Sequence, residues 1–333
     1  MKISKASPRK PNNKAEPASV NATGTICAAG TLGQIIPPSI VLVLLATILQ
    51  GANEEAAMLK GDLAPDPVTA IDLFAGALMP GLMLVVMFII FIYFYARIFP
   101  NSCPPIQTVK SRSEIYKEAF KSIFPPLILI VLVLGSILMG VATPTESASV
   151  GAVGAAIIAF TKGELTFQNL KDVSLNTVKL SSFVFVILIG ASMFSLVFRG
   201  FNGDAMIEHF LGSLPGGLFT ALLIVMIAIF FLGFFLDYIE IIFVIVPLVG
   251  PILIANGADP LWLGILISLN LQTSFLTPPF GFSLFFLRGV APNEIQTRNM
   301  YKGVMPFIGI QVLAIIIVAL FPSIATWLPN LMF

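Results

Sequence analysis

Two apolar helices that lie far apart in the sequence are each interrupted by a pair of prolines. The first interruption is Gly33-Gln-Ile-Ile-Pro37-Pro38-Ser39, and the second is Thr273-Ser-Phe-Leu-Thr277-Pro278-Pro279-Phe-Gly281. Proline lacks a backbone N–H and clashes with the preceding turn, so nearby carbonyls are predicted to lose their helical hydrogen bonds. Inside a bilayer those carbonyls need a polar replacement. Paired interruptions in corresponding positions of two halves are typical of the ion and substrate sites of secondary transporters.

The composition indicates an all-α, polytopic membrane protein. Of the 333 residues, 57% are hydrophobic and 11% are charged, and the mean hydropathy is +0.97, which excludes a soluble domain. One apolar run, residues 218–254, is too long for a single crossing and contains acidic residues, which predicts a re-entrant hairpin with a polar tip. The other predicted spans are residues 22–49, 73–96, 124–142, 147–160, 181–198, 261–287 and 304–321.

The distribution of lysine and arginine predicts the orientation of the chain in the membrane. The loops at residues 97–121, 162–179 and 288–302 are rich in basic residues, which places them in the cytoplasm. Residues 50–72 and 199–217 are poor in basic residues and are predicted to lie outside. The two sides alternate only if the run at 218–254 enters and leaves on the outer side, which independently favours a hairpin.

Other classes of function lack the residues that their chemistry needs. An intramembrane aspartyl protease requires two facing aspartates, and only Asp237 lies deep in an apolar run. A proton-pumping antiporter subunit requires lysine or histidine within its helices, and the predicted spans contain none. The thiols of Cys27 and Cys103 are interpreted as inert. His209 is interpreted as an ordinary residue of a connecting segment. A purely structural membrane subunit remains an alternative.

Five motifs occur in order along the chain. They are Gly24-Thr-Ile-Cys-Ala-Ala-Gly-Thr-Leu-Gly-Gln-Ile-Ile-Pro-Pro-Ser39, Thr143-Pro-Thr-Glu-Ser147, Phe198-Arg-Gly200, Leu232-Gly-Phe-Phe-Leu-Asp-Tyr-Ile-Glu240 and Leu271-Gln-Thr-Ser-Phe-Leu-Thr-Pro-Pro-Phe-Gly281. Together they resemble the large membrane subunit of the tripartite ATP-independent periplasmic (TRAP) transporters. The motif sequences are most similar to those of the family branch labelled mannitol or chloroaromatic compound transport.

The resemblance implies an elevator-type secondary transporter in the bacterial inner membrane, and not an enzyme. In that family two inverted repeats each supply a hairpin and a broken helix, which hold sodium ions and an organic acid in a mobile domain. The implied partners are a small membrane subunit, a soluble periplasmic binding protein and the lipid bilayer, with no nucleic acid. Na⁺ is the implied coupling ion, with no other cofactor.

The resemblance also implies how the chain is divided. Residues 143–322 correspond to a complete second repeat, with its hairpin at 218–254 and its broken helix at 261–287. Residues 22–96 correspond to a remnant of the first repeat, whose hairpin has no counterpart upstream of Asn21. We therefore expect an N-terminally truncated subunit, or one that needs another chain for the missing hairpin, and no transport by this chain alone. The remaining segments are a disordered basic cytoplasmic tail (1–21), a cytoplasmic loop (97–123), a linking helix (124–142) and a C-terminal tail (323–333).

The candidate ligands lie at the helix interruptions and at the hairpin tip. Na⁺ is expected to bind backbone carbonyls and hydroxyls near Gly33 and Thr277. Three hydroxyl residues of the second interruption can instead bond to their own helix, and the two tip acids can instead cap the hairpin. The candidates for binding are Thr31, Gly33, Gln34, Pro37, Pro38, Ser39, Gly233, Asp237, Glu240, Gln272, Thr273, Ser274, Thr277, Pro278, Pro279 and Gly281, and the further motif residues are Thr143, Pro144, Thr145, Glu146 and Arg199.

Overall fold

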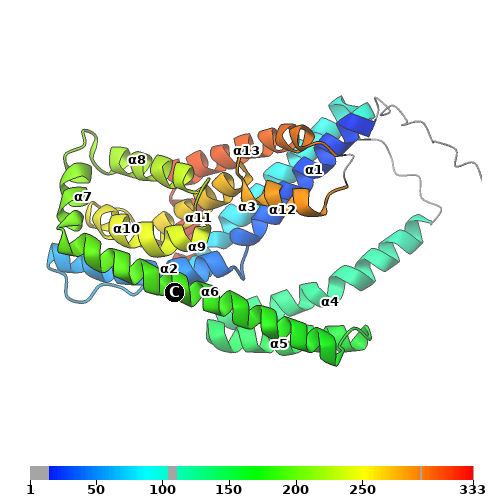
Figure 1. Ribbon diagram of the computed structural model, residues 1–333, viewed down its shortest axis with the longest axis horizontal. Coiled ribbons are helices and arrows are strands. Elements are labelled where there is room, and N and C mark those ends of the chain that lie inside the picture. Colours follow the sequence, from blue (N-terminus) through cyan, green and yellow to red (C-terminus); the bar gives the residue numbers. More distant parts are fainter. Residues whose placement is uncertain (1–14, 104–110, 293–294, 333) are drawn as a thin grey trace, which may run out of the picture.

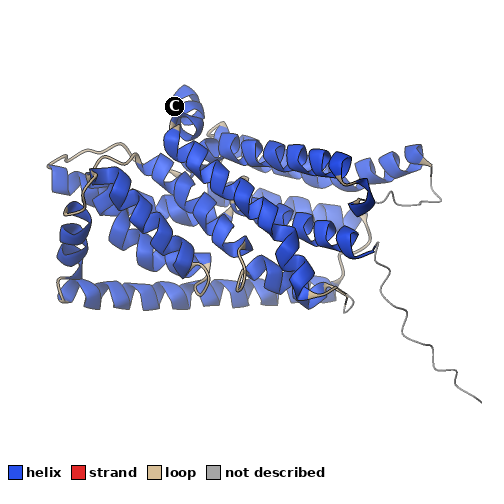
Figure 2. Ribbon diagram, turned by 90° about the horizontal axis from the view of Figure 1, so that it is seen from above, coloured by secondary structure: helices blue, strands red, loops and turns tan. Residues whose placement is uncertain are grey.

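The computed structural model describes residues 15–103, 111–292 and 295–332, and every regular element in these residues is a helix (Figures 1 and 2). In chain order they are α1 (Ala15–Thr31), η1 (Leu32–Gln34), α2 (Ile40–Lys60), α3 (Ala70–Ile98), η2 (Pro100–Ser102), α4 (Arg112–Leu138), α5 (Pro144–Thr161), α6 (Phe167–Gly200), α7 (Gly203–Gly212), α8 (Gly217–Leu232), α9 (Tyr238–Glu240), η3 (Ile241–Ile245), α10 (Val246–Ala255), α11 (Pro260–Leu276), α12 (Phe282–Val290), α13 (Thr297–Leu320) and α14 (Ser323–Met332).

Six helical segments in the described residues are long and apolar enough to cross a membrane. They are Ile40–Lys60, Ala70–Ile98, Ser113–Leu138, Phe167–Gly200, Tyr238–Ala255 and Thr297–Leu320. The two halves of the second interrupted helix, α11 and α12, are shorter, and a crossing there requires both halves. A polytopic, all-helical membrane architecture is therefore confirmed.

Several connections between helices lie at one of two opposite ends of the molecule (Figure 1). The α2–α3 and α6–α7 connections lie at the left end, whereas the start of α1 and the α5–α6 connection lie at the right end. This grouping agrees with the distribution of lysine and arginine among the loops, which predicts that residues 50–72 and 199–217 lie on the same side.

Residues 217–255 have the shape of a hairpin. Helix α8 and the continuous helix from α9 through η3 to α10 run in opposite directions, and both outer ends lie at the left end of the molecule (Figure 1). The turn between them spans residues 233–237. Because the chain enters and leaves at the same end, this segment does not cross the full length of the helical body.

Several helices extend beyond the apolar stretches that the sequence predicts. Helix α1 begins at Ala15, within the predicted tail, and α4 begins at Arg112, within the predicted loop. Helix α6 begins at Phe167, and the predicted C-terminal tail forms α14. Hydropathy marks only the part of a helix that meets lipid, whereas polar turns can continue the same helix into water. Residues 1–14 of the predicted tail lie outside the described residues.

Glycines allow close approach of helix backbones at the centre of the fold. A Cβ added to Gly24 of α1 would lie 2.1 Å from the carbonyl oxygen of Gly303 in α13. Similarly, a Cβ on Gly264 of α11 would lie 2.6 Å from a methyl of Leu49 in α2. Small residues at such crossings let helices pack at short distance in a membrane, where burial of apolar surface contributes little.

Helices α4, α5 and α6 pack on the rest of the molecule along only part of their length (Figure 1). The Ser136 and Ser147 hydroxyls join α4 to α5 at 2.9 Å. The second half of α6 contacts the hairpin, where Ala191 lies with Ile239 and Phe243 in a small buried cluster. The large apolar side chains on the other faces of these helices are exposed, which suits contact with lipid or with another membrane chain.

Candidate functional site at the helix breaks

The two broken helices run antiparallel and cross near the middle of the molecule. Helix α1 lies beside α12, where the Ser283 hydroxyl donates to the Cys27 carbonyl oxygen at 3.2 Å. Helix α2 lies beside α11 through the contact of Leu49 with Gly264. The half before one break thus packs on the half after the other, which brings the two breaks close together.

The first break replaces helical N–H donors by hydroxyl groups. The backbone N–H groups of Ile35 and Ile36 both donate to the Leu32 carbonyl oxygen, at 3.1 and 2.9 Å. The Gln34 carbonyl oxygen accepts from the hydroxyl of Ser39 at 2.6 Å and from that of Ser268 at 3.5 Å. Since Ser268 belongs to α11, the second broken helix helps to satisfy the first.

The second break has a similar plan. The Thr277 N–H donates to the Ser274 carbonyl oxygen at 3.1 Å, and the Thr277 carbonyl oxygen accepts from the Gly281 N–H at 3.0 Å. The Pro279 carbonyl oxygen accepts from the Tyr301 hydroxyl of α13 at 3.0 Å. Both proline pairs contain a cis peptide bond, Pro37–Pro38 and Pro278–Pro279.

The hydroxyl groups before the second break bond to their own helix. Thr273 donates to the Leu269 carbonyl, Ser274 to the Leu271 carbonyl and Thr277 to the Thr273 carbonyl, at 2.7, 2.9 and 2.7 Å. This confirms the structural alternative for these three residues. A hydroxyl that donates its hydrogen still carries lone pairs, so its oxygen can also contact a cation.

The tip of the hairpin packs against the second break. A Cβ on Gly233 would lie 2.3 Å from the Ser274 hydroxyl oxygen, so only glycine allows this approach without a shift. The Phe235 and Phe280 rings lie with centroids 5.4 Å apart, and the Tyr238 and Phe275 rings 5.9 Å apart. The two segments that were predicted to form one site, at residues 233–240 and 272–281, are therefore in contact.

Asp237 and Glu240 cap the second arm of the hairpin. The Asp237 carboxylate accepts from the Tyr238 N–H at 2.7 Å, and the Glu240 carboxylate accepts from the Asp237 N–H at 3.2 Å. This capping box is the structural alternative that the sequence left open. In the described part of the chain, neither carboxylate forms an ion pair. Two acidic groups thus lie half-buried at the hairpin tip without a neutralising side chain.

A buried polar cluster joins the two broken helices to α13. The Thr31 hydroxyl of α1 accepts from the side-chain amides of Gln272 in α11 and Gln311 in α13, at 3.4 and 3.1 Å. All three side chains are almost fully buried. Gln311 was not predicted as a functional residue. Its signal in the sequence is that it stands alone as a polar side chain in an apolar run, which usually marks an interior contact in membrane helices.

The remaining motif residues lie outside the breaks. Thr143 and Glu146 form a capping box at the start of α5, with the Thr143 N–H donating to the Glu146 carboxylate at 2.8 Å. This hydrogen bond holds the pKa of Glu146, in the turn before the apolar part of α5, below its usual range. Arg199, in the last turn of α6, pairs with Glu55 at 3.0 Å and with Asp204 at 3.2 Å. It therefore joins α6 to α2 and α7 rather than facing a break.

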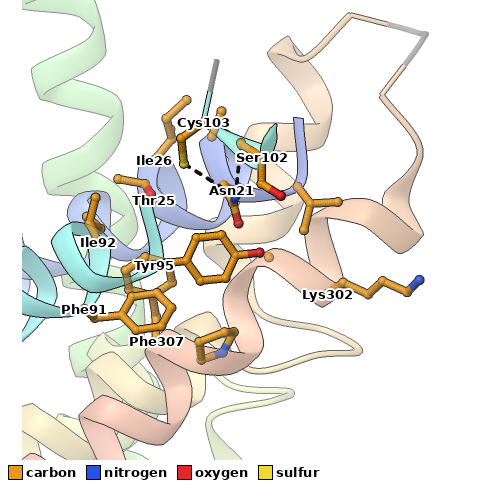
Figure 3. Close-up of a pocket in the computed structure, with 14 residues that line it drawn as sticks. Asn21, Thr25, Ile26, Phe91, Ile92, Tyr95, Ser102, Cys103, Lys302 and Phe307 are labelled. Carbon is orange, nitrogen blue, oxygen red and sulfur yellow. Dashed lines mark hydrogen bonds between the residues drawn. The ribbon is translucent and has the colours of Figure 1, made fainter. Parts of the chain in front are cut away.

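A cavity of about 550 Å³ lies away from the breaks, between the ends of α1, α3 and α13 (Figure 3). Phe91, Ile92 and Phe307 form part of its apolar wall, and Lys302 lies at its edge. The Asn21 side-chain amide donates to the Ser102 carbonyl oxygen at 3.3 Å beside it. None of the predicted ligands lines this cavity, so it is separate from the candidate site.

Comparison with known proteins assigns the chain to a family. A family model described as "Tripartite ATP-independent periplasmic transporter, DctM component" matches residues 13–324. The chain belongs to this family. The C4-dicarboxylate TRAP transporter large permease protein DctM of Vibrio cholerae is 32% identical, over 93% of this chain and 68% of the relative.

Two other relatives of this TRAP permease show the breadth of the family. The sialic acid TRAP transporter large permease protein SiaM of Vibrio cholerae is 26% identical, over 93% of this chain and 67% of the relative. The ectoine TRAP transporter large permease protein TeaC of Halomonas elongata is 30% identical, over 79% of this chain and 60% of the relative. The family consists of transporter permeases that work with a small permease and a periplasmic binding protein, and it is not an enzyme family.

Proposed function

We propose that this chain is the large transmembrane permease subunit of a sodium-coupled, binding-protein-dependent transporter that takes up an organic anion or a related small solute into the bacterial cytoplasm. The observation that carries the proposal is the contact of the hairpin tip with the break between α11 and α12, beside a second break of the same kind. Membership in the TRAP permease family supports the same conclusion.

The breaks offer oppositely charged groups to an ion and to a substrate. Helices α11 and η1 end at the breaks, and the carbonyl groups at helix ends carry partial negative charge that favours a cation. Helices α2 and α12 begin just after the breaks, at Ile40 and Phe282, and their N–H groups favour a carboxylate. We therefore propose Na⁺ sites near Gly33 and Thr277, with the substrate anion close to them.

The acidic hairpin tip adds to this electrostatic pattern. Asp237 and Glu240 place negative charge beside the second break, and charge within a membrane protein is costly unless something compensates it. A Na⁺ at the break would compensate the two carboxylates. The capping role of these residues and an electrostatic role in cation binding are compatible, because the cap uses only part of each carboxylate.

For transport we propose an elevator movement of the body formed by α1, α2, the hairpin, α11 and α12 against the α4–α6 segment. The helices of the first body share one buried core, to which α4–α6 contribute only Val133 and Ile137 among its buried residues. The proposed partners are the small membrane subunit, and the periplasmic binding protein that delivers the substrate. A structural subunit that needs another chain for a second hairpin is the alternative. The relatives described above are named for different compounds, namely C4-dicarboxylates, sialic acid and ectoine.

The proposal is tested by uptake into proteoliposomes that contain this permease with its small subunit, in the presence of the binding protein. Labelled C4-dicarboxylates, sialic acid and ectoine are the probes, since the relatives' names specify them. We expect uptake of a probe to require an inward sodium gradient and no ATP. Uptake that continues unchanged with choline in place of sodium would contradict the coupling, and ATP-dependent uptake would contradict the class of transporter.

A further inference from the structure

Three buried side-chain oxygens lack a hydrogen-bond partner in the described residues. They are the Oε1 atoms of Gln34, Gln272 and Gln311. Gln272 and Gln311 are only 0% and 1% exposed. All three atoms are amide carbonyl oxygens, so each one is an acceptor that a donor or a cation could satisfy.

The amide groups of Gln272 and Gln311 are fixed by a hydroxyl that can make no further bond. The Nε2 atoms of both residues donate to the Thr31 hydroxyl oxygen, at 3.4 and 3.1 Å, and the same hydroxyl donates to the Ala28 carbonyl at 2.9 Å. One hydrogen and two lone pairs are thereby all in use. In this arrangement the Oε1 atoms of both glutamines accept no hydrogen bond within the described residues.

The chemistry of the cluster defines what can bind to it. Acceptors without a donor are satisfied by the hydrogens of water or by a cation, whereas an anion would be repelled. No group of three or more histidine, cysteine or acidic side chains suited to a metal occurs in the described residues, so a divalent ion would lack counter-charge here. A small neutral or monovalent guest remains. Buried water typically bridges two to four such polar groups in proteins.

We propose that Gln272 and Gln311, held together by Thr31, line a closed polar site that holds ordered water or a monovalent cation and joins α1, α11 and α13. Gln311 brings a helix outside both broken helices into the site. A water molecule presents partially positive hydrogens to the carbonyl oxygens and a monovalent cation presents a full positive charge, and the experiments below distinguish them. The inference does not depend on transport activity, because its readouts are unfolding and a density map.

The first test compares Gln311→Met with Gln50→Met in the purified transporter. Methionine keeps much of the volume of glutamine but removes the amide, and Gln50 is an exposed glutamine in the middle of α2 that serves as the control. We expect Gln311→Met to lower the midpoint of thermal unfolding by roughly 2 °C or more relative to the control. An unchanged or higher midpoint would overturn the proposal, because deleting an unsatisfied acceptor without a guest is neutral or favourable.

The same measurement in sodium chloride and in choline chloride identifies the guest. If the unfolding midpoint of Gln311→Met is lowered in both salts, the guest is water. If it is lowered in sodium chloride alone, the guest is the cation. The Thr31→Val background separates the guest from the Thr31–Gln311 hydrogen bond. If Gln311→Met does not lower the unfolding midpoint further in the Thr31→Val background, loss of the Thr31–Gln311 hydrogen bond accounts for the whole destabilisation, and the proposal fails.

A density map of the unmodified transporter provides a test that does not depend on variants. We expect a peak at about 2.4–3.2 Å from the Oε1 atom of Gln272, of Gln311 or of both. At a resolution where other buried waters are visible, an empty site would overturn the proposal.

Discussion

At the scale of residues, the acidic tip of the hairpin shows how one pair of side chains can serve both the fold and the site. Asp237 and Glu240 form a capping box, which stabilises the start of α9. The sequence indicates that these acids are unusual, because they lie deep in an apolar run. It does not distinguish a cap from a ligand, since the difference depends on which backbone N–H groups the turn presents.

Replacing Asp237 by asparagine separates its charge from its cap. Asparagine caps helices about as well as aspartate, so Asp237→Asn should fold like the unmodified protein. It removes negative charge beside the second break, so we expect a higher sodium concentration for half-maximal uptake. Asp237→Ala should in addition lose about 1 kcal/mol of stability. Unchanged sodium dependence in Asp237→Asn would leave this residue with the capping role alone.

The buried glutamines mark the limit of prediction at this scale. Thr31, Gln34 and Gln272 were predicted as candidates because they stand beside the breaks, and the structure places Thr31 against Gln272. Gln311 was missed, because a lone polar residue in an apolar helix does not reveal its partner. Its contact with Thr31 joins residues 280 positions apart and arises only from the packing of α13 on α1.

At the scale of elements, a pair of prolines is not sufficient to break a helix. Helix α4 continues through Pro125 and Pro126, whereas the chain leaves the helix at Pro37–Pro38 and at Pro278–Pro279. The two broken sites share hydroxyl residues and a close partner helix that satisfy the freed backbone, as Ser39 and Ser268 do for Gln34. The existence of the two breaks was predicted from the sequence. Their mutual contact, and the helix ends that extend into polar segments, depend on tertiary packing and on capping.

Close contact between α1 and α13 is expected to depend on Gly24. A methyl group there would meet the Gly303 backbone, which cannot give way as a flexible side chain does. We expect Gly24→Ala to destabilise the protein by about 1–3 kcal/mol. On the same helix, an added Cβ at Gly30 meets no atom within 4 Å, so Gly30→Ala should be neutral or gain about 0.5–1 kcal/mol. Thermal unfolding of the two purified variants gives the comparison, and equal stability would contradict the assigned helix crossing.

At the scale of the whole molecule, the account depends on a chain that crosses the membrane repeatedly but turns back within it at the hairpin. The alternation of basic and base-poor loops predicted this arrangement, and several of these loops lie at one of two opposite ends of the molecule (Figure 1). The distribution of charge was sufficient for this prediction because each loop is short and lies next to an apolar stretch.

Labelling of single cysteines in intact cells with an impermeant thiol reagent tests the central claim, that residues 217–255 form a hairpin whose tip meets a helix break. The cysteines are placed one at a time at Asn53, Ser111, Ser213 and Asn256 in a background that lacks Cys27 and Cys103. We expect labelling from outside at Asn53, at Ser213 before the hairpin and at Asn256 after it, but not at Ser111. Labelling at Ser213 with protection at Asn256 would mean that this segment crosses the membrane, and labelling at Ser111 would reverse the orientation.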